Sequence, residues 1–515
     1  MNAKNYIDSS FGSMFLWERG IPNGLIFRGG SSIVWNNAHR WLDFRGALHI
    51  DKGAFSRNAF MLLFFFIALL SSLHLFSGYA DNGDFYRNVA FLFEKPLGFS
   101  TMSPSPDTAE WANRYWSQWH DRWVLLSDIP NFKDIVTYSS YQIYLYFQVK
   151  FFSWISSGSE YYSLIAGSLL SRILYLATFF CFLCYVRKTV NIFAFWVSFA
   201  VCGSIILDVN FGAFFNSFYE EQIAIIFLPI LAFLLYSFYY QKNNNFIFLL
   251  LLVSTFIGAA KTAYFYLPFL LAFFLAPSLY RRNIFAKFII LSIFCQIISF
   301  LPVFFGKYGN INQYHSVYIG ALTVLDEDEI REINKIGEKP ILVDCIGVQA
   351  FFQKGHSCME RASANYSDVI KLVYHHPYVA TRMVRAVIEK GGQIEIYLGK
   401  KMSGVDNFSN IPLFNLWKVV FLKNYNFAFL LISFASIFLY IFFKFSNTSR
   451  AMLLTGIFLS FFGFSQYVAA LGDGFGAIEK HLIGGNYALA LSAAFIFPAL
   501  LQVIYETFVS RKVSG

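Results

Sequence analysis

The stretch Ala59–Ser77 (AFMLLFFFIALLSSLHLFS), with Asp81–Asn88 (DNGDFYRN) close behind it, decides the fold class of this chain. The apolar run has the length that the hydrocarbon core of a bilayer requires, about 20 residues. Two carboxylates three positions apart and an arginine three further on follow it. Charged groups at a membrane boundary are costly unless they are solvated, paired or functional. The sequence therefore predicts a membrane helix that delivers Asp81, Asp84 and Arg87 to one face of the membrane.

The composition extends this interpretation to the whole chain. Of the 515 residues, 57% are hydrophobic, 20% are aromatic and only 14% are charged, whereas charged residues make up about a quarter of a soluble domain. The net charge of +9 does not indicate nucleic-acid binding, because the basic residues lie in the tails and in short loops between apolar runs. We therefore expect an all-α polytopic membrane protein.

Ten apolar segments are long enough to be expected as membrane spans. They are residues 58–77, 161–186, 190–207, 223–240, 246–260, 263–279, 285–304, 425–443, 451–470 and 482–504. Basic residues in the first segment of the chain and after alternate spans place both termini in the cytoplasm by the positive-inside rule. The predicted parts are a cytoplasmic segment 1–57, a membrane domain 58–304 with an acidic outer loop 78–160, an extracytoplasmic α/β or α domain 305–420, and C-terminal membrane helices 421–515.

The predicted outer loop carries aromatic residues at helical spacing. Ser105-Pro106 has the pattern of an N-cap followed by the first helical position, and four aromatic residues then recur every four positions. They are Trp111, Tyr115, Trp119 and Trp123. Because Trp and Tyr favour the headgroup layer, a helix lying flat on the outer leaflet is favoured over a helix of a soluble subdomain. Residues 143–155 are expected to form a second such helix or a re-entrant piece.

Four polar clusters face the same side of the membrane on this topology. They are Asp81, Asp84 and Arg87; Glu220 and Glu221; Lys261; and Asp473, Glu479, Lys480 and His481. The last three of these residues directly precede a span, at a helix N-terminus, where backbone donors favour an anion. One such cluster is usually a solvated cap of a span, whereas four clusters on one side favour a functional site.

Carboxylates beside cations at a membrane surface suit the transfer of a sugar from a lipid-linked donor. A carboxylate can take the proton from the attacking hydroxyl, and cations or backbone donors can stabilise the leaving phosphate. A nearby carboxylate also stabilises the oxocarbenium-like sugar carbon. The acids are compatible with a divalent metal ion, but no ligand pattern indicates one, and no cofactor other than the sugar donor is expected.

Two further features fall outside these clusters. Arg172 lies well inside the span 161–186, where it could contact a lipid phosphate, pair with a carboxylate or snorkel to the interface. Cys345 and Cys358 are the only cysteine pair predicted to face an oxidising compartment, so we expect a disulfide between them.

A first span that delivers acidic residues into a long outer loop with interfacial helices resembles the GT-C superfamily of polytopic glycosyltransferases, which use polyprenyl-phosphate sugars. More narrowly, the chain resembles a bacterial family of glycan-biosynthesis hexosyltransferases over residues 59 to about 490. The residues that resemble this family are Asn82-Gly83-Asp84-Phe85, Asn216 through Glu221, Lys261, Asn312 to Gly320, and Gly472-Asp473-Gly474 with Glu479-Lys480-His481. The sequence departs from the family at Glu220-Glu221-Gln222, where a single acid followed by a proline or another small residue is expected.

The resemblance implies roles for individual residues. Asp84 or Asp81 would be the general base of a reaction that inverts the anomeric centre, with Glu220 and Glu221 as further acids. The expected substrate-binding residues are Asn82, Arg87, Arg172, Asn216, Tyr219, Lys261, His315, Asp473, Glu479, Lys480 and His481.

The expected protein is a GT-C-type enzyme of the bacterial inner membrane with its active site on the extracytoplasmic face. It would move a sugar, expected to be a hexose, from a polyprenyl-phosphate carrier to a surface glycan such as O-antigen. Its partners would be the lipid-linked donor, the glycan acceptor and the bilayer. One alternative is a flippase, polymerase or transporter of lipid-linked glycans, which would bind its substrate without taking a proton from a hydroxyl. Another is a non-catalytic membrane scaffold with an outer recognition domain.

Overall fold

The computed structural model describes residues 54–76, 88–101, 121–128, 139–156, 160–280, 282–305, 309–336, 339–350, 353–390, 412–422, 426–442, 445–475 and 478–513. The chain divides into two compact units, Met1–Asn58 and Ala59–Gly515. Apart from residues 54–58, every described residue belongs to the second unit. Residues 1–53 of the predicted cytoplasmic segment lie outside the described residues.

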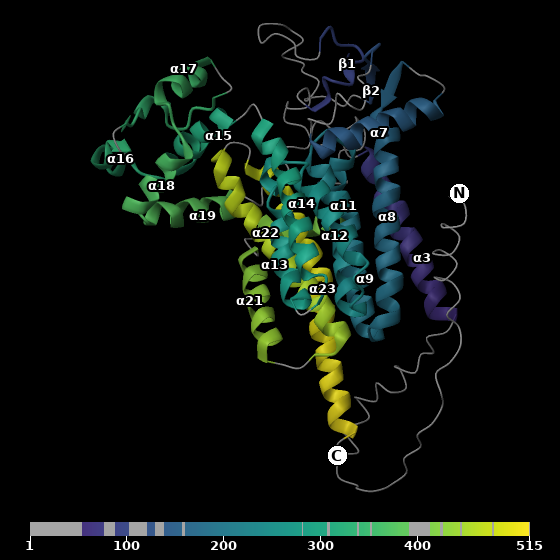
Figure 1. Ribbon diagram of the computed structural model, residues 1–515. Coiled ribbons are helices and arrows are strands. Elements are labelled where there is room, and N and C mark those ends of the chain that lie inside the picture. Colours follow the sequence, from purple (N-terminus) through teal and green to yellow (C-terminus); the bar gives the residue numbers. More distant parts are fainter. Residues whose placement is uncertain are drawn as a thin grey trace. The chain divides into compact units, whose positions relative to one another are not determined.

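A helix covers each of the ten segments that the sequence predicts as spans. These helices are α3 (Ala54–Ser71), α8 (Leu164–Thr189), α9 (Ile192–Leu207), α11 (Glu221–Gln241), α12 (Phe246–Gly258), α13 (Leu267–Leu279), α14 (Phe285–Phe305), α21 (Asn426–Phe442), α22 (Asn447–Ala470) and α23 (Ile478–Val513). Helices α8, α9, α11, α12 and α23 run alongside one another (Figure 1).

Fewer than ten of the described helices are long enough to cross a membrane on their own. Within the described ranges, seven helical stretches are long and apolar enough to do so. An eighth is counted if α9 and the following helical turns, α10 (Val209–Gly212) and η4 (Ala213–Asn216), form one span that bends by 52°. Helix α12 has 13 residues and α21 has 17. A helical multi-pass membrane protein is therefore confirmed, while the count of ten spans stays a prediction.

Local sequence signals set the ends of these helices. The Ser163 hydroxyl accepts a hydrogen bond from the Ala166 amide and so caps α8, and the Asn191 side chain does the same for α9 at Ala194. Such caps satisfy amide groups that have no partner within the helix. Helix α11 ends at Lys242, whose φ of 54° is left-handed, a common way of terminating a helix.

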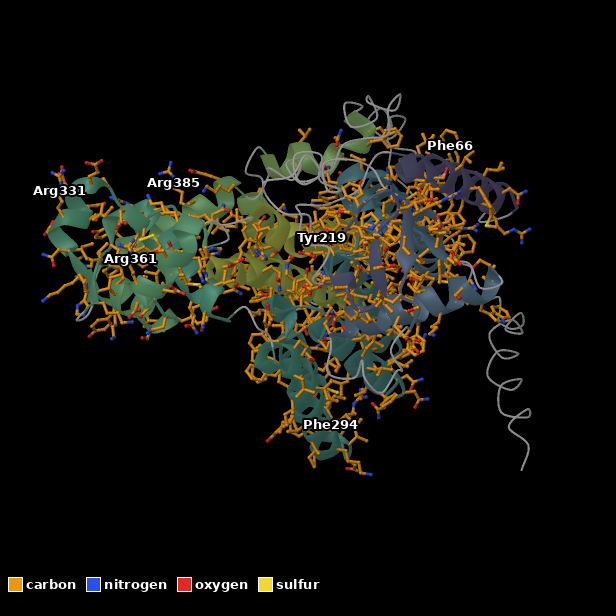
Figure 2. The ribbon with its side chains drawn as sticks, turned by 90° about the horizontal axis from the view of Figure 1, so that it is seen from above. Phe66, Tyr219, Phe294, Arg331, Arg361 and Arg385 are labelled. Atoms are coloured by element: carbon orange, nitrogen blue, oxygen red, sulfur yellow. A yellow bond between two sulfur atoms is a disulfide. The ribbon has the colours of Figure 1, made fainter. Side chains whose placement is uncertain are left out.

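Small residues let the central helices α22 and α23 pack closely. A Cβ atom added at Gly463 would lie 2.8 Å from Leu489 Cγ, and one added at Gly456 would lie 2.5 Å from Ile496 Cγ1. Such small residues at helix contacts are typical of membrane bundles, where tight packing replaces the hydrophobic effect. At the edge of the bundle, Phe66 and Phe294 are exposed and point outward (Figure 2), as lipid-facing side chains do.

A small sheet lies in the predicted outer loop, which the all-α prediction missed. Its strands are β1 (Phe93–Pro96), β2 (Arg122–Leu125) and β3 (Tyr161–Ser163), joined in the order β1-β2-β3 by antiparallel pairs. Trp123 lies in β2, so its assignment to a helix on the outer leaflet is wrong. Its ring is buried against Phe93 and Phe218, because strand pairing and this aromatic cluster outweigh the four-residue spacing. Trp111, Tyr115 and Trp119 lie outside the described residues.

The segment 143–155 forms part of α7 (Ser140–Ile155), as a continuous helix. Tyr141, Leu145 and Val149 bury one face, whereas Phe147 and Trp154 are exposed. An exposed apolar face on a helix outside the spans is typical of interfacial helices. The placement of α7 on the membrane surface stays a prediction.

The polar block after α14 has a hydrophobic core of its own, which includes Tyr314, Leu322, Cys345, Cys358 and Met383. Its elements are α15 (Gly309–His315), the π-helix η6 (Ser316–Ala321), η7 (Leu322–Val324), α16 (Glu327–Ile333), the hairpin of β4 (Lys335–Ile336) and β5 (Lys339–Pro340), η8 (Val343–Cys345), α17 (Gln353–Ala362), α18 (Tyr366–His375) and α19 (Tyr378–Lys390). Arg331 and Arg385 point outward from it (Figure 2). We call residues 309–390 the outer block, after the side of the membrane that the sequence predicts for it.

The end of the predicted domain 305–420 contacts the membrane helices. There η11 (Pro412–Phe414) and α20 (Leu416–Leu422) follow one another, and both contact α9. The Trp417 amide donates to Asp208 Oδ2 at 3.1 Å, and its indole Nε1 donates to Ser204 Oγ at 3.1 Å. Asp208 is fully buried, so its carboxylate joins this segment to the end of α9.

Candidate functional site

The first predicted cluster lies outside the described residues, but both of its flanks are described. On the N-terminal side, His74 Nε2 donates to the Leu207 carbonyl at 2.9 Å, and Asn216 Nδ2 donates to the His74 carbonyl at 2.9 Å. On the C-terminal side, Asn88 Nδ2 donates to the Phe218 carbonyl at 3.0 Å. Asp81, Asn82, Asp84 and Arg87 therefore belong to a segment whose two ends are attached to one loop, residues 207–220.

Arg172 secures the same loop from α8. Its Nη2 donates to the Gly212 carbonyl at 3.0 Å and to Asn216 Oδ1 at 3.1 Å, and its guanidinium lies 5.0 Å from the centroid of the Phe215 ring. The side chain is buried, which rules out snorkelling. These contacts make Arg172 and Asn216 residues that hold the bend after α9 in place.

Glu221 and Lys261 form a buried ion pair. Lys261 Nζ lies 2.5 Å from Glu221 Oε1, and the two side chains are 5% and 1% exposed. Glu221 is the first residue of α11, and Lys261 follows the end of α12. The structure thus brings together two of the predicted clusters. Glu220 precedes this pair and is partly exposed, whereas Tyr219 is buried.

Two tyrosines near this pair were not predicted. The start of α7 is fixed beside the end of α12, because Ser140 Oγ donates to the Phe256 carbonyl and the Ser140 amide donates to the Ala259 carbonyl. This fixes Tyr141 close to the acids. Burial, with the charges of Glu220 and Glu221 among its further causes, raises the pKa of Tyr141 well above its ordinary value, so its hydroxyl stays protonated.

The second tyrosine is Tyr264, whose ring centroid lies 5.9 Å from Lys261 Nζ. The hydroxyls of Tyr141 and Tyr264 are both buried, and neither has a hydrogen-bond partner among the residues that the structure describes. A buried hydroxyl without a partner is costly. We define Glu221, Lys261, Tyr141 and Tyr264 as the ion-pair cluster.

Three other predicted residues form a second site, the His-Asp-His cluster. Asp473 Oδ1 lies 3.2 Å from His315 Nδ1, and Asp473 Oδ2 lies 2.7 Å from His481 Nε2. The Ala350 amide donates to His315 Nε2 at 3.1 Å. His315 Nε2 is therefore the acceptor nitrogen, and Nδ1 carries the proton that is donated to Asp473. This cluster joins the outer block to the ends of α22 and α23.

Close backbone packing supports the His-Asp-His cluster. Gly474 follows Asp473 with a φ of +63°, a conformation that favours glycine. A Cβ at Gly474 would overlap the His315 carbonyl. Any other residue would therefore push the outer block away from the end of α22.

The start of α23 links the two clusters. Gly484 packs against the Tyr264 hydroxyl so closely that a Cβ at this position would overlap it. Gly484 comes three residues after His481, which is about one helical turn. One turn of α23 therefore contacts both the ion-pair cluster and the His-Asp-His cluster. Glu479 and Lys480 lie in the first turn of this helix.

A disulfide joins Cys345 and Cys358, whose Cα atoms are 5.5 Å apart. With Asp344 they are the one group of three potential metal ligands in the described part of the chain. Both sulfurs are in the disulfide, so neither is a thiolate that could bind a metal ion. Arg361 covers the bridge: its Nη2 pairs with Asp344 at 2.8 Å and lies 3.2 Å from Cys345 Sγ.

Residues 49–337, more than half of the chain, match the family model of the YfdI N-terminal transmembrane domain. The chain belongs to the YfdI family. A relative, the uncharacterized protein YfdI of Escherichia coli strain K12, is 28% identical in an alignment over 398 residues, which covers 71% of this chain and 82% of that protein. No solved structure matches the chain. The YfdI match includes Glu221, Lys261 and His315, and it supports a multi-pass membrane protein.

Proposed function

We propose that this protein is a membrane glycosyltransferase of the GT-C type. It transfers a sugar, a hexose in our proposal, from a polyprenyl-phosphate carrier to a surface glycan such as O-antigen. The proposal is supported by the attachment of both flanks of Asp81–Arg87 to the loop that ends in the buried Glu221–Lys261 pair. The two described flanks of the segment that carries these acids are thereby attached to the residues that lead into a buried carboxylate paired with a buried ammonium group.

The proposed chemistry is a single displacement at the anomeric carbon. The acceptor hydroxyl oxygen forms a bond to this carbon while Asp84, or Asp81, takes the hydroxyl proton. The bond between the anomeric carbon and the phosphate oxygen breaks, and its electron pair leaves with polyprenyl phosphate. Attack from the face opposite the phosphate inverts the anomeric centre.

The ion-pair cluster offers donors for the leaving phosphate. An ammonium group has three protons, and Glu221 accepts one from Lys261. The other two can be donated to phosphate oxygens as charge develops on them. The hydroxyls of Tyr141 and Tyr264 could donate to the phosphate or the sugar, which would give each buried hydroxyl a partner.

The proposed location is the bacterial inner membrane, with the active site on the extracytoplasmic face and both termini in the cytoplasm. The basic pairs Arg187-Lys188 and Arg281-Arg282 support this orientation, since positive residues are retained on the cytoplasmic side. The outer block, joined to α22 and α23 by the His-Asp-His cluster, would then lie on the side of the acceptor glycan.

The test is donor turnover by purified Asp84→Asn and Asp81→Asn variants, with Asp128→Asn as the matched control. Asp128 is exposed and lies in the same predicted outer loop. Loss of a general base should lower the rate about 10²–10⁴-fold, so one of the first two variants should lose transfer and the control should keep it. Full transfer by both variants would contradict the proposal and favour a transporter of lipid-linked glycans.

A further inference from the structure

A basic cavity lies at the opposite end of the bundle from the ion-pair cluster. Its volume is about 240 Å³, and its lining includes Lys242, Arg282 and Arg450. Lys242 follows the end of α11, Arg282 follows the end of α13, and Arg450 lies in the first turn of α22. The same three helices have Glu221, Tyr264 and Asp473 at or next to their other ends. Helix α11, with 21 residues, separates the two ends by about 30 Å.

The three cations have no carboxylate partner in the described part of the chain. Arg282 donates to the Lys242 carbonyl at 3.3 Å and to the Asn244 side chain, and Arg450 donates to Tyr440 Oη at 2.6 Å. The described lining of the cavity includes no acid. The nearby Glu506 carboxylate accepts hydrogen bonds from Ser446 and Gln502 instead.

The helix dipole favours the positions of two of these cations but disfavours the position of the third. Positive side chains are favoured near helix C-termini, where Lys242 and Arg282 lie. Arg450 is near the N-terminus of α22, where the dipole disfavours a cation. An anion bound between the three side chains would compensate this cost.

Apolar side chains line the cavity together with its polar ones. Phe238 lies one helical turn before Lys242 on α11, and Leu454 lies one turn after Arg450 on α22, and both line the cavity. A soluble anion gains nothing from these apolar side chains, whereas a phospholipid presents a phosphate next to its glycerol esters and apolar acyl chains. We propose that this cavity binds the phosphate headgroup of an anionic phospholipid, independently of the proposed transferase activity. Basic pockets between membrane helices are suited to such headgroups.

The test measures the binding of phosphatidylglycerol and of phosphatidylcholine to the purified full-length chain by native mass spectrometry. Each cation near a membrane surface contributes about a fivefold change in affinity for an anionic lipid. Arg282→Gln with Arg450→Gln should therefore weaken phosphatidylglycerol binding about 25-fold and leave phosphatidylcholine binding unchanged. Lys287→Gln is the matched control, because Lys287 is exposed at the start of α14 and does not line the cavity.

Charge-retaining variants and a competition arm complete the experiment. Arg282→Lys with Arg450→Lys should keep most of the phosphatidylglycerol binding. This result would show that the Gln variants lose binding because they lose charge and not because they misfold. Inorganic phosphate at millimolar concentration should not displace the lipid. Equal affinity for the two lipids, equal losses in the Lys287 control, or displacement by inorganic phosphate would overturn the lipid assignment.

Discussion

Breaking the buried Glu221–Lys261 pair should destabilise the protein far more than removing both partners together. In Lys261→Met, the buried Glu221 carboxylate would lose the Lys261 ammonium group, and in Glu221→Gln the ammonium group would lose the Glu221 carboxylate. Both side chains are at most 5% exposed, so water cannot replace the missing partner. The double variant leaves neither charge behind.

The expected magnitude follows from this burial. Two unit charges about 4 Å apart attract by about 4 kcal/mol at an effective dielectric constant of 20. Removing one member of a buried pair costs about 3–5 kcal/mol, whereas replacing both with groups of similar volume is often close to neutral. Each single variant should therefore lose about 3–5 kcal/mol of unfolding free energy, and the double variant should recover most of this loss.

The assay is a double-mutant cycle on unfolding of the purified protein in lipid nanodiscs, followed through denaturant titration. The exposed pair Arg385–Glu389 on α19, with side chains 80% and 52% exposed, serves as the control cycle. This control cycle should show no measurable coupling, because solvated ion pairs contribute little to the free energy of unfolding. Additive losses in the Glu221–Lys261 double variant would refute a coupled buried pair.

Three further predictions concern topology, the outer block and the loop after α9. An impermeant thiol reagent applied to intact cells should label Ser367→Cys and not Asn283→Cys in a background without accessible native thiols; the reverse pattern would contradict the orientation. Mass spectrometry of non-reduced peptides should find Cys345 linked to Cys358, and removing the bridge should cost the outer block about 2–4 kcal/mol; two alkylated thiols would disprove the link. Arg172→Met should lower the unfolding free energy by about 1.5–3 kcal/mol, since its charge-assisted hydrogen bonds are lost; unchanged stability would show that Arg172 does not hold the loop.

The sequence predicted most of the structural features that a bilayer requires of this chain. Apolar runs marked the ten helices, because a bilayer requires long uninterrupted apolar segments. The proximity of Glu221 and Lys261 also followed from topology, since both residues come where expected spans meet the same face. The YfdI match supports the multi-pass character and leaves the transferase activity as a proposal.

What the sequence could not predict depends on contacts between distant segments. Tyr141 reaches the ion-pair cluster only because Ser140 bonds to the end of α12, and nothing in its own neighbourhood signals this. Arg172 had three open roles, and the structure gives it hydrogen bonds to a loop that no local pattern identifies. Trp123 continued a helical spacing but pairs in a strand, because cross-strand partners are invisible in a single segment. Tyr264 was missed as well, although its position three residues after Lys261 was a local signal.

The central claim is that a sugar leaves its lipid carrier on this protein. Purified wild-type protein in liposomes should be given a labelled polyprenyl-phosphate sugar and an acceptor glycan. We predict that labelled sugar appears on the glycan and that polyprenyl phosphate is released in equal amounts. The claim would be contradicted if the labelled sugar stayed attached to its lipid carrier while the intact molecule crossed the bilayer.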